Sequence, residues 1–219
     1  HFELDGLKGS MASTGVVGVW AGPRTPGTAY NLLHHALGEL DGIEGAWGQV
    51  VGGMGAISEA IARSAEAAGA EIRTGAEVVS IDVAGGRARG VALADGTEIK
   101  APIVASGAHP KTTVLELAGA QNFPSEVSDA MRRYRTRGAS VKINMVLGEP
   151  PRYEGVSEAE QQMMMSAGVN ICPSIDYLER AWQDATLGKP AERPYVEAEL
   201  PSHVDSSLTD DGTYVMTMF

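Results

Sequence analysis

WGQVVGGMG (Trp47–Gly55) opens the stretch that decides the fold, which runs to SGAHP (Ser106–Pro110). After the glycines, apolar residues recur at three- and four-residue spacing, which predicts an amphipathic helix. The apolar stripe is narrow and rich in alanine, so the helix can lie close to a sheet. Gly69 follows it, where a left-handed C-terminal cap is expected. The stripe consists of Ala56, Ile57, Ala60, Ile61, Ser64, Ala65 and Ala68.

Short strands follow this helix and form a predicted β-meander. The apolar run 103–105 lacks polar alternation, which is typical of a strand covered on both faces in a parallel sheet. Ser106 and Gly107 come directly after it, and their small size lets a ligand approach the backbone. The meander comprises strands at 71–74, 78–83, 87–93 and 97–100, with tight turns at Gly85-Gly86 and Asp95-Gly96.

The glycine loop lies where a pyrophosphate-binding turn would stand. Residues 53–58 (GMGAIS) occupy the place of a G-x-G-x-x-G turn, which holds a pyrophosphate on a helix N-terminus. However, Ser58 replaces the third glycine, and no acidic residue ends a second strand about twenty positions later. Two interpretations therefore stay open: a loop that admits close packing, or a loop that passes beside a flavin bound mainly by other residues.

Composition limits the classes of partner. The chain has 219 residues, of which 43% are hydrophobic, enough for one or two domains of roughly 100 to 200 residues. No apolar stretch approaches the roughly 20 residues of a membrane span. The net charge of −11 argues against a nucleic-acid partner, because phosphate binding needs clustered Lys and Arg. The basic run from Arg132 to Arg137 is typical of cations near a helix C-terminus.

Few side chains stand out as candidate catalytic groups, and we assign no catalytic residue and no metal site. Cys172 is the single cysteine, so the chain has no C-x-x-C pair, and we expect a buried structural thiol. His34 and His35 are about 100° apart on a helix, so at most one faces a given site. We expect one at the surface and one hydrogen-bonded in packing, with a proton carrier as the alternative. His109, before Pro110, is expected in a turn.

Both ends of the chain have the character of interior sequence. The chain begins without methionine, and the strand-like alternation of residues 213–219 stops abruptly, which we interpret as an exposed edge strand. We therefore expect an internal segment of a longer protein, and possible homo-oligomers through exposed strand edges. We expect a cytoplasmic location if the source is bacterial; organellar targeting stays open.

Outside residues 46–110, helices and strands alternate without an internal repeat. Polar and apolar residues alternate around Lys142 and Asn144, as on a strand. The sequence predicts helices at 29–40, 112–117, 125–134 and 175–185, and strands at 140–147, 195–200 and 213–219.

Several segments together resemble a known family. They are YNLLHHALGELDG (30–42), GAWG (45–48), GGMGA (52–56), GVALADGTE (90–98), KIN (142–144) and PSHVD (201–205). This set resembles the phytoene-dehydrogenase-like flavoproteins across nearly the whole chain. The set is specific in combination, although no single piece would be.

The resemblance implies a mixed α/β fold in which the chain passes between a Rossmann-like FAD/NAD(P)-binding domain and a substrate domain. Residues 46–110 would form the middle part of the FAD domain, with 1–45 and 111–219 in the substrate domain. In this family the first strand carries G-x-G-x-x-G and the last segment closes over the flavin; neither is present here.

The resemblance also implies cofactor contacts. Val78 matches the position whose backbone touches the adenine. Gly52, Gly53 and Met54 would lie beside the flavin, as would Ser106 and Gly107.

The implied activity is hydride transfer from an apolar small-molecule substrate to FAD. We expect FAD to be absent or weakly bound in this chain, which would be inactive alone. The alternative is a non-catalytic binding or assembly module that keeps the fold without cofactor. A hydrolase is disfavoured, because no G-x-S-x-G elbow appears.

Overall fold

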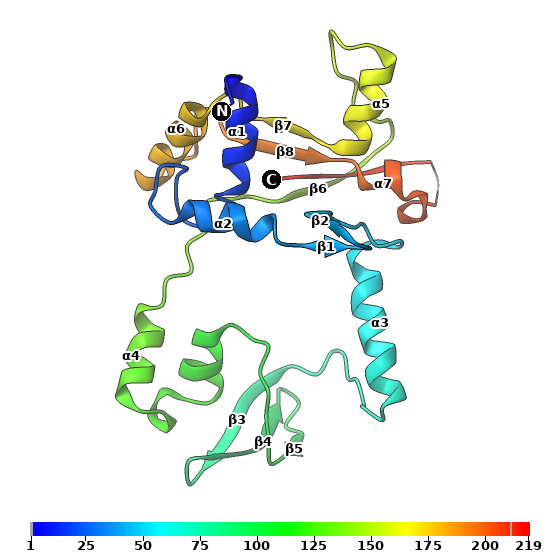
Figure 1. Ribbon diagram of the computed structural model, residues 1–219. Helices are drawn as coiled ribbons and strands as arrows, with labels where there is room; N and C mark the ends of the chain where they lie inside the picture. The colour runs from blue at the N-terminus through cyan, green and yellow to red at the C-terminus, as the bar shows by residue number, and fades with distance from the viewer. Residues whose placement is uncertain (1, 211) are drawn as a thin grey trace. The chain divides into compact units, whose positions relative to one another are not determined.

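The computed structural model describes residues 2–210 and 212–219 and divides the chain into two compact units. The first unit combines His1–Arg63 with Arg137–Phe219, and the second is Ser64–Thr136. Helix α3 (Gly53–Ala67) begins in the first unit and ends in the second (Figure 1). It confirms the helix predicted from the alanine-rich stripe, and Gly69 beyond its end has the expected left-handed backbone (φ +90°).

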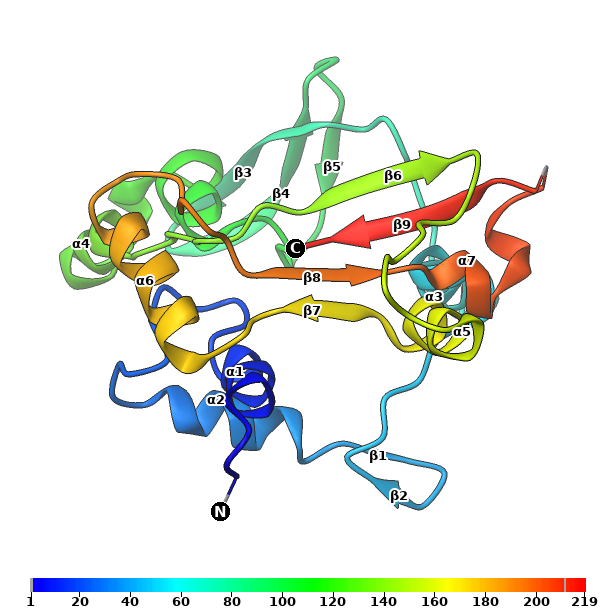
Figure 2. The ribbon, with the colours of Figure 1, turned by 90° about the horizontal axis from the view of Figure 1, so that it is seen from above.

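The first unit is built on a four-stranded antiparallel sheet with the strand order β6-β9-β8-β7 (Figure 2). Its strands are β6 (Ile143–Leu147), β7 (Val169–Ile171), β8 (Val196–Glu199) and β9 (Tyr214–Met218). The prediction that residues 213–219 form an exposed edge is wrong, because β9 pairs with β6 on one side and β8 on the other. The alternation identified a strand, but its neighbours come from distant parts of the chain.

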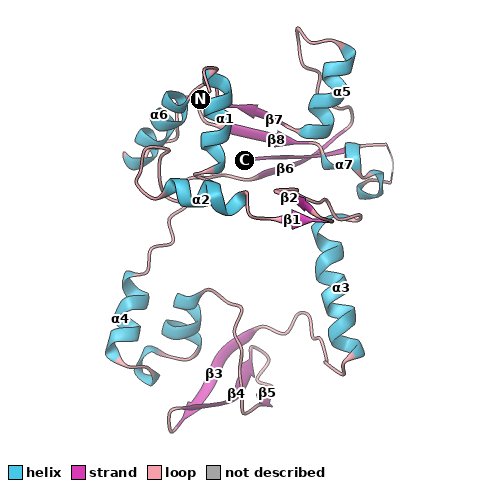
Figure 3. Cartoon of the chain, viewed as in Figure 1, coloured by secondary structure: helices cyan, strands magenta, loops and turns pink. Residues whose placement is uncertain are grey.

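Helices lie at both ends of this sheet, with α1 and α6 near one end and α5 and α7 near the other (Figure 3). Helix α1 contacts α6 and α2, while α5 contacts α7 and β8. The helix predicted for 29–40 ends at His35, because residues 39–44 form the hairpin of β1 and β2, which turns at Asp41-Gly42. The elements are α1 (Asp5–Thr14), α2 (Thr28–His35), β1 (Glu39–Leu40), β2 (Ile43–Glu44), α5 (Glu158–Ala167), α6 (Ile175–Thr186), α7 (Pro201–Val204) and a 3-10 helix (Ser206–Leu208).

The second unit contains the predicted β-meander. Its strands β3 (Val78–Ala84), β4 (Arg87–Leu93) and β5 (Glu98–Lys100) form an antiparallel sheet in sequence order. The Asp95 carboxylate accepts a hydrogen bond from the Thr97 amide at 2.8 Å, which closes the second turn and lowers the pKa of Asp95. A π-helix (Thr112–Leu117), a 3-10 helix (Ala120–Asn122) and α4 (Ser125–Arg133) complete the unit.

Two predicted strands do not form. Residues 71–74 and 103–105 are irregular, and the side chain of Ile103 is 82% exposed. A strand needs a partner for its backbone groups, and every strand pair among the described residues is antiparallel and lies elsewhere. The apolar character of residues 103–105 favours a strand, but it does not show whether another strand lies beside them.

Each unit has a small apolar core. Leu200, directly after β8, is 4% exposed, and Leu93, the last residue of β4, is 7% exposed. The mixed α/β class predicted from the sequence is confirmed. The other buried apolar residues in the described chain are Ala118, Met165, Cys172, Leu178 and Ala198.

Gly90 is the position where the meander depends most strictly on glycine. Its φ is +156°, and an added Cβ would lie 2.1 Å from the Ile99 carbonyl oxygen of β5. We expect Gly90→Ala to lower the free energy of unfolding of the second unit by at least about 2 kcal/mol, since strain and overpacking combine. Urea unfolding followed through the β3–β5 amides measures it. Gly107→Ala, whose Cβ meets no atom within 4 Å, is the control; equal stability of the two variants would contradict the prediction.

Candidate functional site

The glycine loop before α3 adopts a backbone that few other residues tolerate. Gly52 and Gly53 have φ of +86° and +74°, in the left-handed region where a side chain is strained. The Gly52 N–H donates to Oδ2 of Asp205 at 2.7 Å. A carboxylate from the segment after α7 therefore fixes the entry to the helix.

Asp205 is itself held in place. Its Oδ1 accepts hydrogen bonds from the Ser207 hydroxyl at 2.6 Å and the Ser207 amide at 3.0 Å. The Ser207 hydroxyl, followed by the Gly52 amide, lowers the pKa of the Asp205 carboxyl, because these donors stabilise the charged form. One turn earlier, the Ser202 hydroxyl accepts from the Val215 amide of β9 at 2.9 Å. The loop is thus connected through α7 to β9, an interior strand of the sheet.

The bond between Gly52 and Asp205 determines whether the loop can bind the diphosphate of FAD. A phosphate at a helix N-terminus is bound by free backbone N–H groups, but the Gly52 N–H already donates to a carboxylate. A diphosphate would have to displace Asp205 and would be repelled by its charge. The residues present therefore do not fit the diphosphate at this loop. Sequence reasoning missed Asp205, whose only local signal is the serine two residues later.

The remaining predicted contacts lie in the second unit. Val78 is the first residue of β3 and is 36% exposed. The Ser106 and Thr113 hydroxyl oxygens are 2.7 Å apart, and the Ala108 amide donates to the Ser106 oxygen at 3.3 Å. These bonds hold the exposed Gly107 in a turn beside the π-helix. The predicted contacts thus form two groups, Gly52–Met54 in one unit and Val78, Ser106 and Gly107 in the other, and their role toward the flavin stays a prediction.

The two adjacent histidines have different surroundings. His34 is exposed, whereas His35 Nδ1 lies 2.8 Å from the Asn31 carbonyl oxygen and its ring stacks on Trp47 at 5.7 Å. This confirms the expectation of one surface and one hydrogen-bonded histidine. His109 Nδ1 accepts from the Lys111 amide at 3.1 Å, and the residue lies directly before the helical residues that start at Pro110.

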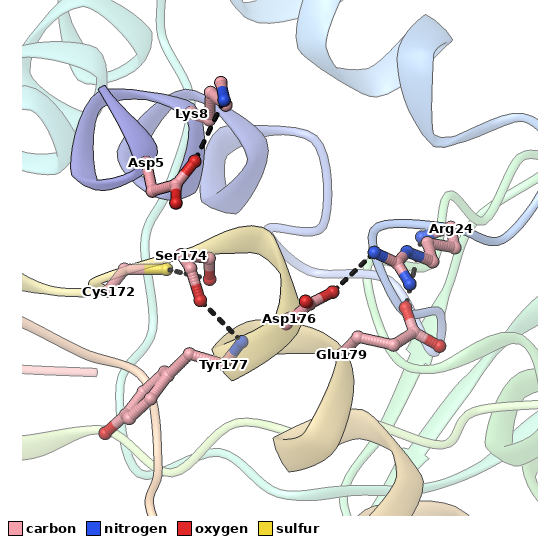
Figure 4. A network of polar contacts seen from close by, with 8 residues as sticks. All are labelled: Asp5, Lys8, Arg24, Cys172, Ser174, Asp176, Tyr177 and Glu179. Atoms are coloured by element: carbon pink, nitrogen blue, oxygen red, sulfur yellow. Dashed lines mark hydrogen bonds and ion pairs between the residues drawn. The ribbon is translucent and has the colours of Figure 1, made fainter. Parts of the chain in front are cut away.

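Cys172 is 5% exposed, as expected of a structural thiol. Figure 4 shows it beside Ser174 at the start of α6. Burial raises the pKa of the thiol, which disfavours the nucleophilic thiolate. Two residues later the Ser174 hydroxyl accepts from the Tyr177 amide at 3.1 Å and caps α6. The same helix is bound by Arg24, whose guanidinium pairs with Asp176 and whose amide donates to Glu179 at 3.2 Å.

Within residues 2–210 and 212–219, no group of three or more His, Cys, Asp or Glu residues is arranged to hold a metal ion. Nor does any helix there have the length and apolar character needed to cross a membrane.

Comparison with known proteins assigns the chain to a family. The family model "DAO: FAD dependent oxidoreductase" matches residues 40–218, which include the glycine loop, the meander and the four-stranded sheet. The chain belongs to the FAD dependent oxidoreductase family. The mixed α/β fold agrees with that assignment.

Three relatives show how much of a protein in this family the chain represents. It is 36% identical to the mouse and rat proteins named pyridine nucleotide-disulfide oxidoreductase domain-containing protein 2, across its whole length but over only 39% and 38% of theirs. It is 30% identical to the chloroplastic prolycopene isomerase of Arabidopsis thaliana, over 77% of this chain and 25% of that one. The chain thus spans about two fifths of the mammalian relatives. No solved structure matches it.

Proposed function

We propose that the chain forms the middle part of a phytoene-desaturase-like FAD-dependent oxidoreductase, which transfers a hydride from an apolar substrate to the flavin. The observation that carries the proposal is the family match over residues 40–218. The chain's share of its mammalian relatives, 39% of the mouse protein, supports a part of a larger enzyme. The plant relative gives distant support to the phytoene-dehydrogenase-like branch.

Within that enzyme, residues 46–110 belong to the FAD domain and the flanking segments to the substrate domain. Gly52, Gly53 and Met54 lie beside the flavin together with Ser106 and Gly107, and Val78 meets the adenine. Two features support these roles: Met54 is 80% exposed, and the Ser106-Gly107 turn presents small, accessible residues. With Cys172 as the single cysteine, paired-thiol chemistry has no place within these residues.

The chain alone binds FAD weakly in this account. The diphosphate of FAD is the group that most needs free backbone donors, and the glycine loop of this chain already donates to Asp205. The alternative function, a binding or assembly module without cofactor, is favoured only if the full-length gene product also lacks flavin.

Flavin retention separates these possibilities. We expect the purified 219-residue chain to lose added FAD on gel filtration, because the main diphosphate donors are encoded elsewhere. We expect the full-length gene product to remain yellow, with the absorbance of bound flavin. Stoichiometric FAD bound to the isolated chain would contradict the proposal that the main diphosphate-binding groups lie outside these 219 residues. A colourless full-length product would favour the binding or assembly module.

We also propose self-association of the isolated chain through a strand edge. With β9 in the interior, the edges of the larger sheet are β6 and β7, and Val146 of β6 is 72% exposed. Sedimentation at micromolar concentration should show dimers or larger species. Val146→Lys should shift them toward monomer, because an edge lysine opposes strand pairing. A monomeric unmodified chain would contradict the proposal.

A further inference from the structure

We propose that Asp205 is a positioning and selectivity residue: its carboxylate holds the glycine loop in shape and keeps phosphate groups away from the first turn of α3. The loop then accepts only neutral ligand atoms, such as those of an aromatic ring. The identity of that ligand as a flavin rests on the proposed function. The effect of the carboxylate on anions does not.

The two carboxylate oxygens of Asp205 have different partners: Oδ1 binds Ser207, and Oδ2 binds the glycine loop. Oδ1 is held by both the hydroxyl and the amide of Ser207, at 2.6 and 3.0 Å. Oδ2 therefore points away from Ser207 and accepts the Gly52 N–H at 2.7 Å. Hydrogen bonds to a charged acceptor are shorter and stronger than neutral ones. The Ser207 pair orients the group before it reaches the loop.

The same segment also limits where the loop can move. A Cβ added to Gly53 would lie 3.0 Å from Cδ2 of Leu208, so the loop backbone runs close against that side chain. Asp205 and Leu208 thus contact the two successive left-handed glycines from one short stretch of chain. The Ser202 hydroxyl, at 2.9 Å from the Val215 nitrogen, ties this stretch to β9.

Selectivity follows from the charge at the helix start. The N-terminus of an α-helix attracts anions through its free N–H groups and its dipole. The first turn of α3 carries no acidic side chain, so the helix itself does nothing to neutralise this field. Asp205 supplies the negative charge from 153 residues away. A phosphate that approaches the helix start therefore meets the Asp205 carboxylate, which already accepts the Gly52 N–H.

Inorganic pyrophosphate is the probe for this proposal. It is titrated into the ¹⁵N-labelled chain while the amide signals of Gly52, Gly53, Met54 and Gly55 are followed. We expect no saturable shift of these signals in the unmodified chain and a saturable shift in Asp205→Ala, where the Gly52 N–H is free. Asp210→Ala removes the same charge from an exposed position five residues later in the sequence and should behave as the unmodified chain.

Two results would overturn the proposal: saturable shifts of these amides in the unmodified chain, or an Asp205→Ala variant that responds no more than Asp210→Ala. The β9 amides report whether each variant is folded. If Asp205→Ala does not fold, Asp205→Asn decides, because it keeps an acceptor for Gly52 but loses the charge. A greater pyrophosphate response than that of the unmodified chain supports the proposal, and an equal response refutes it. Flavin retention by the full-length product is measured separately, so the role of Asp205 and the proposed FAD-dependent function can be refuted independently.

Discussion

The hydrogen bond from the Gly52 amide to the Asp205 carboxylate is the contact on which the shape of the glycine loop depends. It joins residues 153 positions apart and fixes the backbone just before α3. Through α7 and the Ser202–Val215 bond it connects that point to β9, one of the two interior strands of the sheet. The glycine loop is therefore part of the sheet's framework, and its shape is set by the first unit of the chain.

Other polar contacts contribute less to the fold. The described ion pairs join exposed side chains, and all but Arg24–Asp176 lie close in sequence, as Lys8–Asp5 and Arg132–Asp129 do. Pairs of this kind stabilise by only about 0 to 1 kcal/mol. The buried cores are small, while large apolar side chains including Trp47, Met54 and Ile103 are 74%, 80% and 82% exposed. The proposed larger enzyme accounts for these surfaces, because its other segments would cover them.

Local signals predicted the local parts of the fold. The apolar spacing identified α3, and the paired glycines at 85–86 located the turn between β3 and β4. The failures have a common cause. Strand pairing is a property of two segments, and the sequences of 103–105 and 213–219 carry no sign of which segments lie beside them. The role of Asp205 was not predicted for the same reason. Its segment contributed to the family resemblance, but nothing near it in sequence indicates a hydrogen bond to Gly52.

The most direct test of the central contact is the position of the Gly52 amide signal as the pH is lowered. The hydrogen bonds to Asp205 lower its folded pKa, so their stabilisation is present above the unfolded value of about 3.9 and is lost as the pH falls through the lower folded value. The Gly52 amide should therefore shift with a midpoint below about pH 3.9. Ser207→Ala should move that midpoint upward, since it removes the largest cause of the lowered pKa. A Gly52 signal that does not respond, or a midpoint at or above the ordinary value, would contradict the account.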